Sequence, residues 1–106
     1  MIPKELSIQS IGQVYNKIKP FINVTPLIKA IDVVDEILNT NVFLKFECFQ
    51  KSGSFKARGA INNILSSSAK ELKNGITAVS AGNHAIAASY VSNIFKLKNK
   101  IFLYES

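Results

Sequence analysis

The sequence predicts an α/β fold, in which a mostly parallel sheet is flanked by helices. Short segments rich in β-branched and aromatic residues alternate along the chain with longer segments whose apolar residues recur at helical spacing. Turn signals that contain glycine or asparagine separate several of these segments. Of the 106 residues, 47% are hydrophobic and 19% are charged, a composition typical of a globular protein rather than a disordered one.

The first part of the chain predicts a helix, a short strand and a second helix. Apolar residues over 6–22 recur on one helical face, and Pro20 marks the end of that helix. Pro26 holds Thr25 extended, and a strand is expected over 27–30. Asp32 is placed to cap a helix that ends near residue 38. The two predicted apolar faces contain Ile8, Ile11, Val14, Tyr15, Ile18 and Ile22 in the first helix, and Val33, Val34, Ile37 and Leu38 in the second.

The middle of the chain predicts a strand, a turn and a helix in direct succession. Residues 42–49 are rich in β-forming side chains, with Lys45 and Glu47 on one face of the predicted strand. Residues 50–54 contain turn-forming residues, and an amphipathic helix is expected over 55–67, with Ser54 as its cap.

The last third of the chain predicts a strand, a helix and a further strand. Residues 76–80 form a buried strand, 81–83 a tight corner, 84–95 an alanine-rich helix and 101–104 the next strand. A parallel sheet of three or four strands leaves apolar faces and edges uncovered. We therefore expect the chain to be part of a larger pair of domains, with a fold that is incomplete at its C-terminus.

The composition argues against several classes of protein. The net charge is +6, but the basic residues are scattered along the chain, which disfavours a nucleic-acid binder. No apolar run reaches the roughly 18 residues that a membrane span requires. The single cysteine, Cys48, has no internal disulfide partner, which fits a cytoplasmic protein. Without clustered histidine or cysteine residues, we expect no metal site.

The first candidate site is Lys56, at the start of the predicted 55–67 helix. Its ammonium lies near the positive end of the helix dipole, which favours the neutral amine that attacks an aldehyde to form a Schiff base. Gly53 allows the chain to turn closely, and Phe55 offers an aromatic face to a flat ring. Taken alone, a lysine in this position is also typical of an ordinary protein surface.

The second candidate site follows the predicted strand 76–80 and reads Ser80-Ala81-Gly82-Asn83-His84-Ala85. Backbone N–H groups at such a helix start attract a phosphate or a carboxylate. His84 is the only histidine, and at a helix N-terminus it is more often an orienting donor than a general base. Two corners at consecutive strand ends are expected to face one crevice at the carboxyl edge of the sheet.

The segment from Phe49 to Ala60, which contains Gln50-Lys51-Ser52-Gly53-Ser54-Phe55-Lys56-Ala57-Arg58-Gly59, resembles the cofactor-lysine motif of the serine/threonine dehydratases and serine racemases, which are pyridoxal-phosphate enzymes of fold type II. Thr25-Pro26-Leu27 and Ser80-Ala81-Gly82-Asn83-His84-Ala85 are similar to two further motifs of that family, in the same order. The resemblance covers the chain from about residue 15 onward.

The resemblance implies a role for each matching residue. Lys56 would carry pyridoxal 5'-phosphate and take the α-proton of the substrate, Phe55 would pack on the pyridine ring, and Asn83 would donate to the phenolic oxygen. Ser80, Gly82, Asn83 and His84 would hold the substrate carboxylate. Where racemases of the family carry a serine as a second base, this chain has Ala81, which favours dehydration.

The hypothesis that follows is an ammonia-lyase that converts L-threonine or L-serine to a 2-oxo acid and ammonia. Residues 1–106 would form the N-terminal part of its catalytic region, comprising the start of the large domain and the first part of the small domain. The family also implies a homo-oligomer, commonly a dimer. The phosphate-binding glycine-rich loop and the partner of the pyridine nitrogen would lie beyond residue 106, so the 106 residues alone are expected to be inactive. A non-catalytic truncated product, a racemase and a β-replacement enzyme remain alternatives.

Overall fold

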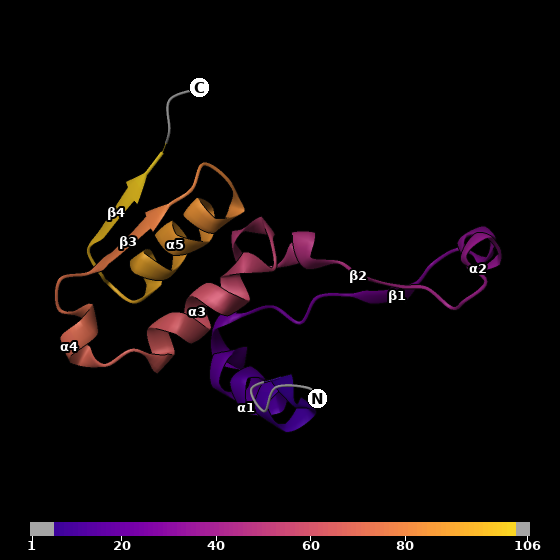
Figure 1. The fold of residues 1–106 in the computed structure, drawn as a ribbon, viewed down its shortest axis with the longest axis horizontal. Helices are drawn as coiled ribbons and strands as arrows, with labels where there is room; N and C mark the ends of the chain where they lie inside the picture. Colours follow the sequence, from indigo (N-terminus) through magenta and orange to yellow (C-terminus); the bar gives the residue numbers. More distant parts are fainter. Residues whose placement is uncertain (1–5, 104–106) are drawn as a thin grey trace.

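The computed structural model describes residues 6–103, which form a helical body with a small sheet and a projecting arm (Figure 1). The body contains α1 (Ile8–Ile18), α3 (Lys56–Ser66) and α5 (Asn83–Ile94), with β3 (Ile76–Val79) and β4 (Asn99–Phe102). The arm contains β1 (Leu27–Lys29), α2 (Asp32–Leu38) and β2 (Phe43–Lys45). Because the arm extends away from the body, the radius of gyration is 16.9 Å, against about 13 Å for a compact domain of this length.

The core of the body lies where α3 packs against α5 and the end of α1. It is formed by Ile18 from α1, Ala57, Ile61 and Ile64 from α3, and Val91 from α5. The i, i+4, i+7 spacing of the α3 residues places them on one helical face, as the 55–67 pattern predicted. α3 is therefore held in place by packing along its length, and this packing also supports its first residue, Lys56.

β3 and β4 form a parallel pair joined through α5, which confirms the predicted strand–helix–strand unit. Ile76 pairs with Asn99 and Val79 with Phe102. β4 begins two residues before the predicted start of its strand, and the predicted last residue, Tyr104, lies outside the described residues. In Figure 1, α5 lies against this two-stranded sheet, with α3 on the side of α5 toward the arm.

The entry to β3 depends on Gly75, which has a φ of +87°. A β-carbon at this position would lie 2.2 Å from the carbonyl oxygen of Lys98, the atom that accepts a hydrogen bond from the Ile76 N–H. We expect Gly75→Ala to destabilise the fold by more than about 2 kcal/mol, since both the backbone and the strand pairing must shift. Chemical denaturation followed by circular dichroism measures this difference.

Gly12 in α1 provides the matched control, because a β-carbon there meets nothing within 4 Å. Gly12→Ala is expected to leave the stability unchanged or to raise it by up to about 1 kcal/mol, owing to the higher helix propensity of alanine. Equal effects of the two substitutions would show that the contact with Lys98 carries no cost.

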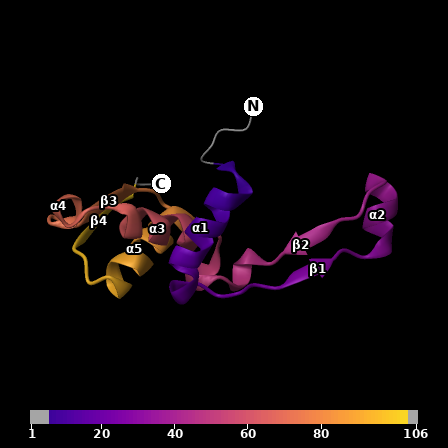
Figure 2. The same cartoon turned by 90° about the horizontal axis from the view of Figure 1, so that it is seen from below.

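α1 ends just before Pro20, as predicted, but it is shorter than the 6–22 pattern, and half of its apolar face is exposed. The Ser7 hydroxyl caps the helix by accepting from the Ser10 N–H at 3.1 Å, and a 3₁₀ turn over Lys19–Phe21 contains Pro20. Ile18 is buried, whereas Ile8 is 90% exposed. The predicted continuous buried face is therefore wrong for the first turns of α1, which lie away from α3 among the described residues (Figure 2).

The arm departs most from the predicted architecture. β1 and β2 pair antiparallel in a sheet of their own, so the prediction of one mostly parallel sheet is wrong for these strands. α2 ends at Leu38 as predicted but begins one residue early, and its predicted buried face is wrong at Ile37, which is 76% exposed, and at Leu38, which is exposed as well. Asp32 is the first residue of α2 and makes no capping contact as an N-cap, since that place is taken by Ile31.

Two further elements differ from the sequence-based expectation. The strand predicted over 42–49 ends at Lys45, and 3₁₀ turns over Glu47–Phe49 and Lys51–Gly53 lead into α3. A short helix, α4 (Ala69–Leu72), was not predicted; Ser68 and Glu71 form a reciprocal capping box at its start. Across residues 6–103, the structure contains no helix long and apolar enough to cross a membrane.

Candidate functional site

A cavity of about 450 Å³ lies between α3, β3 and α5, and it contains the first candidate site. Its lining includes Phe55 and Lys56 at the start of α3, and His84 in the first turn of α5. Ile64, Ile76, Ala78, Ala88 and Val91 contribute apolar surface, while Asn63 and Thr77 add polar groups. The cavity therefore combines an amine, an aromatic ring and an imidazole with a mostly apolar wall.

Lys56 occupies the first position of α3, and its side chain is exposed at the cavity. The Lys56 Nζ lies 4.8 Å from the centroid of the Phe55 ring, the distance of a cation–π contact. Phe55 is 57% exposed, so one ring face is accessible to a flat ligand. The amine and the aromatic face predicted from the sequence thus lie together.

The predicted capping role of Ser54 is wrong. The residue before the first helical residue is Phe55, and no side-chain hydrogen bond caps α3. Ser54 is 7% exposed, and within the described part of the chain its hydroxyl is buried without a hydrogen-bond partner. Ser54 has an extended backbone, with φ of −159°, and lies one residue before the N-cap position that Phe55 occupies. Its side chain is therefore not placed to cap the helix.

The second candidate site forms the start of α5, where Gly82 is the N-cap and Asn83 the first helical residue. The Ser80 hydroxyl accepts a hydrogen bond from the Gly82 N–H at 3.1 Å. The N–H groups of Asn83 and His84, in the first turn, have no acceptor within the helix itself, as at every helix start. These donors and the helix dipole favour an anion.

The structure brings together only part of the predicted site. Phe55, Lys56 and His84 line the cavity, whereas Ser80, Gly82 and Asn83 are not among its lining residues. The argument from two strand ends at one sheet edge is also incorrect, because β2 and β3 belong to different sheets. Lys56 and His84 reach the same cavity because α3 packs on α5, a contact between helices rather than between strands.

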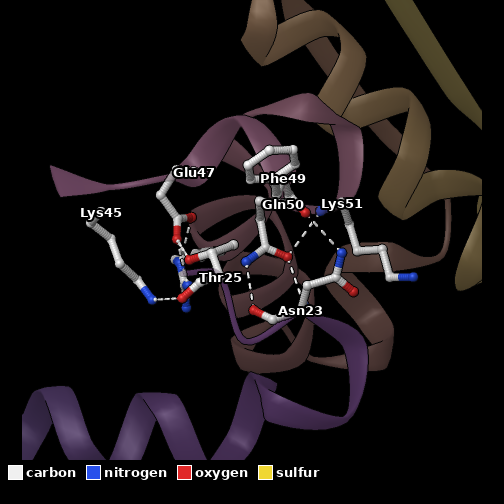
Figure 3. A network of polar contacts seen from close by, with 8 residues as sticks. Asn23, Thr25, Lys45, Glu47, Phe49, Gln50 and Lys51 are labelled. Carbon is white, nitrogen blue, oxygen red and sulfur yellow. Dashed lines mark hydrogen bonds and ion pairs between the residues drawn. The ribbon is translucent and has the colours of Figure 1, made fainter. Parts of the chain in front are cut away.

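A polar network behind the start of α3 joins three segments that are distant in sequence (Figure 3). Arg58 donates to both carboxylate oxygens of Glu47, from Nε at 2.8 Å and from Nη2 at 2.7 Å. Glu47 Oε1 also accepts from the hydroxyl of Thr25 at 2.6 Å, and Lys45 Nζ donates to the Thr25 carbonyl at 2.6 Å. The Thr25 motif and the Lys56 motif are therefore linked through Glu47.

Gln50 forms the second half of this network and is 4% exposed. Its side-chain oxygen accepts from the backbone N–H groups of Asn23 and Lys51, and its amide nitrogen donates to the Asn23 carbonyl at 2.9 Å. The Asn23 side chain donates in turn to the Phe49 carbonyl (Figure 3). The turn that precedes α3 is thus held to the segment that follows α1.

The network shifts the ionisation of its members. The hydrogen bonds from Arg58 lower the pKa of Glu47 from 4.5 to about 2, with a further contribution from Thr25, while Glu47 raises the pKa of Arg58. A lowered carboxyl pKa stabilises the fold above the unfolded-state value near 4.5, and this stabilisation is lost as the pH falls toward 2. The ion pair is therefore intact throughout the neutral range.

We expect wild-type protein to lose on the order of 1–3 kcal/mol of stability through Glu47 between pH 4.5 and pH 2. Glu47→Gln removes the titrating group, so the variant should be less stable at pH 7 and should show a shallower decline with acid. Urea denaturation at a series of pH values measures both slopes. Parallel slopes for the two proteins would contradict the assignment, and other carboxylates cancel in the comparison.

Sequence reasoning named several residues of this network within motifs but missed the contacts among them, and it missed two polar residues of the cavity, Asn63 and Thr77. Helical spacing carries a signal for the latter, since Asn63 lies seven positions after Lys56 and therefore on the same face of α3. Glu47 and Arg58 are 11 residues apart, on separate elements, and no periodicity connects them. Residues 6–103 contain no cluster of His, Cys, Asp or Glu able to hold a metal ion.

Comparison with known proteins identifies similar sequences and folds. The model of a family described as pyridoxal-phosphate dependent enzymes matches residues 18–106. A serine racemase from Arabidopsis thaliana is 40% identical over 87 residues, which are 82% of this chain and 26% of the racemase. The catabolic L-threonine dehydratase TdcB of Staphylococcus aureus (strain USA300) is 40% identical over 101 residues, which are 95% of this chain and 29% of the dehydratase.

The structural comparison agrees with the sequence comparison. The structure of maize serine racemase matches with a TM-score of 0.81 and 31% identity, over 93% of this chain and 31% of the racemase. The predicted α/β class, as part of a fold type II enzyme, is thereby confirmed. The chain spans less than a third of the length of each of these proteins.

Proposed function

This chain belongs to the pyridoxal-phosphate-dependent enzyme family, and on that premise we propose that it forms part of an ammonia-lyase acting on L-threonine or L-serine. The products are a 2-oxo acid and ammonia. Residues 1–106 contribute the start of the large domain and the first part of the small domain of the catalytic region. The active form is a homo-oligomer, for which a dimer is the simplest arrangement.

The observation that carries this proposal is the meeting of Lys56 and Phe55 in one cavity with His84. Pyridoxal phosphate requires an amine for its aldehyde and an apolar surface for its ring. Lys56 Nζ and the accessible Phe55 ring provide these, and the cavity of about 450 Å³ has room for a ligand of this size. The residues present therefore fit the aldehyde end and the ring of the cofactor.

Each residue of the site has a distinct task in this reaction. Lys56 would hold the cofactor covalently through Nζ, and the same amine, once free, would take the proton from the substrate α-carbon. Phe55 would offer its ring face to the cofactor ring, and Asn83, which precedes His84 but is not a lining residue of the cavity, would donate a hydrogen bond to the phenolic oxygen. When bound, pyridoxal phosphate supplies the electron sink that makes the α-proton removable and allows the β-hydroxyl to leave.

The start of α5 holds the substrate carboxylate. The N–H groups of Asn83 and His84 point along the helix axis, where an anion is stabilised by the dipole. Ser80 and Gly82 are already hydrogen-bonded to each other. The Ser80 hydroxyl accepts in this bond, so its own O–H can still donate to the carboxylate, whereas the Gly82 N–H must exchange the bond to contact it directly.

Ala81 favours dehydration over racemisation. Racemisation requires a proton donor on the face of the α-carbon opposite to the lysine, and a methyl group provides none. Both a serine racemase and a threonine dehydratase are 40% identical to this chain, so overall similarity does not separate the two activities. The choice between them therefore rests on the side chain at this position.

The proposal is tested by treating the full-length enzyme of which residues 1–106 are proposed to form part with pyridoxal phosphate and borohydride, and then mapping the labelled peptide. Label is expected on Lys56; label on a different lysine would refute the assignment. Incubation with L-serine and L-threonine should release 2-oxo acid and ammonia in equal amounts. Formation of D-serine without ammonia would instead establish a racemase, and absence of both label and turnover would indicate a non-catalytic product.

A further inference from the structure

We propose that Glu47 and Arg58 are positioning residues that hold the first turn of α3 so that Lys56 stays directed at the cofactor cavity. This inference rests on the proposed function, because it concerns how the cofactor lysine is placed. Neither residue lines the cavity, so both act through the backbone of the helix rather than by contact with the ligand.

The geometry of the helix places the lysine and the anchor on different sides. Successive residues in an α-helix are rotated by about 100°, so Lys56 and Arg58 leave the first turn roughly 200° apart. Lys56 faces the cavity, while Arg58 contacts Glu47 in the 3₁₀ turn Glu47–Phe49. Ala57, between them, is fully buried in the core. The first turn of α3 is thereby held on the side away from the cavity, while the side that carries Lys56 remains accessible.

The anchor fixes orientation as well as distance. Arg58 uses two different nitrogen atoms to reach the two carboxylate oxygens at 2.8 and 2.7 Å, a bidentate arrangement that resists rotation. The side chains of Arg58 and Glu47 are 28% and 17% exposed, so water competes only partly with the pair. The Thr25 hydroxyl, in a residue that is 3% exposed, holds Glu47 from the other side.

An anchor is needed at this place because α3 has no side-chain cap. Helices α1 and α4 begin with capping serines, Ser7 and Ser68, whereas no side chain caps α3 and the nearby Ser54 hydroxyl is unpaired within residues 6–103. The first turn is held on the backbone by hydrogen bonds from the Ala57 N–H to the Ser54 carbonyl at 3.4 Å and from the Arg58 N–H to the Phe55 carbonyl at 3.1 Å, and a first turn without a side-chain cap opens more readily. Lys56 is the first residue of this turn and would move with it.

Two variants test the role, and one provides the control. Arg58→Lys keeps the charge but loses the two-pronged contact, and Glu47→Gln keeps the size but loses the charge. Lys29→Gln removes an ion pair of similar length, 3.0 Å to Asp35, in the arm. We expect the rate of borohydride-trapped labelling at Lys56 to fall between about 10- and 100-fold in the first two and to remain unchanged in the control.

Hydrogen exchange separates positioning from a general loss of stability. In Arg58→Lys and Glu47→Gln, exchange should accelerate by a larger factor at amides in the first turn of α3 than at those over 61–66, whose acceleration should match the fall in global stability measured by urea denaturation. A uniform increase along α3, or an unchanged first turn, would overturn the proposal. If Arg58→Lys does not fold, Glu47→Gln with its nearly unchanged shape decides the question alone.

A double variant tests whether Glu47 and Arg58 act through one shared contact. Because both residues act through one contact, the double variant should label at the same rate as either single variant. Multiplying effects would refute the shared mechanism. Wild-type protein without label on Lys56 would overturn the proposed function itself, whereas labelled wild type with equally labelled variants would overturn only this inference.

Discussion

Replacing Lys56 with alanine is expected to eliminate covalent attachment of pyridoxal phosphate and to lower kcat/KM for L-threonine by at least about 1,000-fold in the full-length enzyme of which residues 1–106 are proposed to form part. No other described residue of the cavity lining carries an amine. Because Lys56 is exposed and alanine favours helices, the free energy of unfolding should change by less than about 0.5 kcal/mol. Absorbance of the bound cofactor measures attachment, steady-state kinetics measure kcat/KM, and urea denaturation measures the free energy of unfolding.

Lys70 in α4 provides the matched control, since it is an exposed helical lysine that does not line the cavity. Lys70→Ala should retain both cofactor attachment and turnover. If Lys56→Ala retains cofactor attachment, or if both variants lose attachment equally, the reactive amine must lie elsewhere. Partial rescue of Lys56→Ala by added methylamine would further support a role in proton transfer.

Ile61→Ala is expected to reduce the free energy of unfolding by about 2–5 kcal/mol, a large part of the stability of a domain of this size. Ile61 is fully buried at the centre of α3 and is one of the largest fully buried side chains. Truncation leaves a void between α3 and the helices packed against it, and this weakens the support of the cavity as well. Urea denaturation measures the loss of stability.

Ile37→Ala in α2 makes the same chemical change in a helix, but at a side chain that is 76% exposed. Its effect should remain below about 1 kcal/mol, since little apolar surface is uncovered. If Ile37→Ala lowers the free energy of unfolding as much as Ile61→Ala does, the Ile37 side chain must be buried against another surface.

The elements that sequence reasoning placed well are those determined by neighbours close in the chain. α2 ends at the predicted residue and begins one residue early, and the bounds of α3 and α5 agree within one residue at each end. Pro20 and Gly75 act locally, through a restricted φ and a positive φ. Interactions of this kind span only a few residues, so they can be predicted from the neighbouring residues in the sequence.

Sequence periodicity did not determine which apolar faces find a partner. Ile8 and Ile18 belong to one helical face, yet the first is 90% and the second 3% exposed. Burial depends on where α3 lies relative to α1, and no pattern within α1 encodes that distance. The antiparallel pairing of β1 with β2 is a similar case, because strand direction depends on how the connecting α2 turns the chain.

The sequence by itself determined the α/β class, the family and the placement of Lys56 at a helix start beside Phe55, because these rest on local patterns and on three ordered motifs. Only the tertiary structure decided that Lys56 and His84 share a cavity through helix packing, and that Glu47 links Thr25 to Arg58. Such contacts join residues on separate elements, and their distances follow from how those elements pack, not from the spacing of residues along the chain.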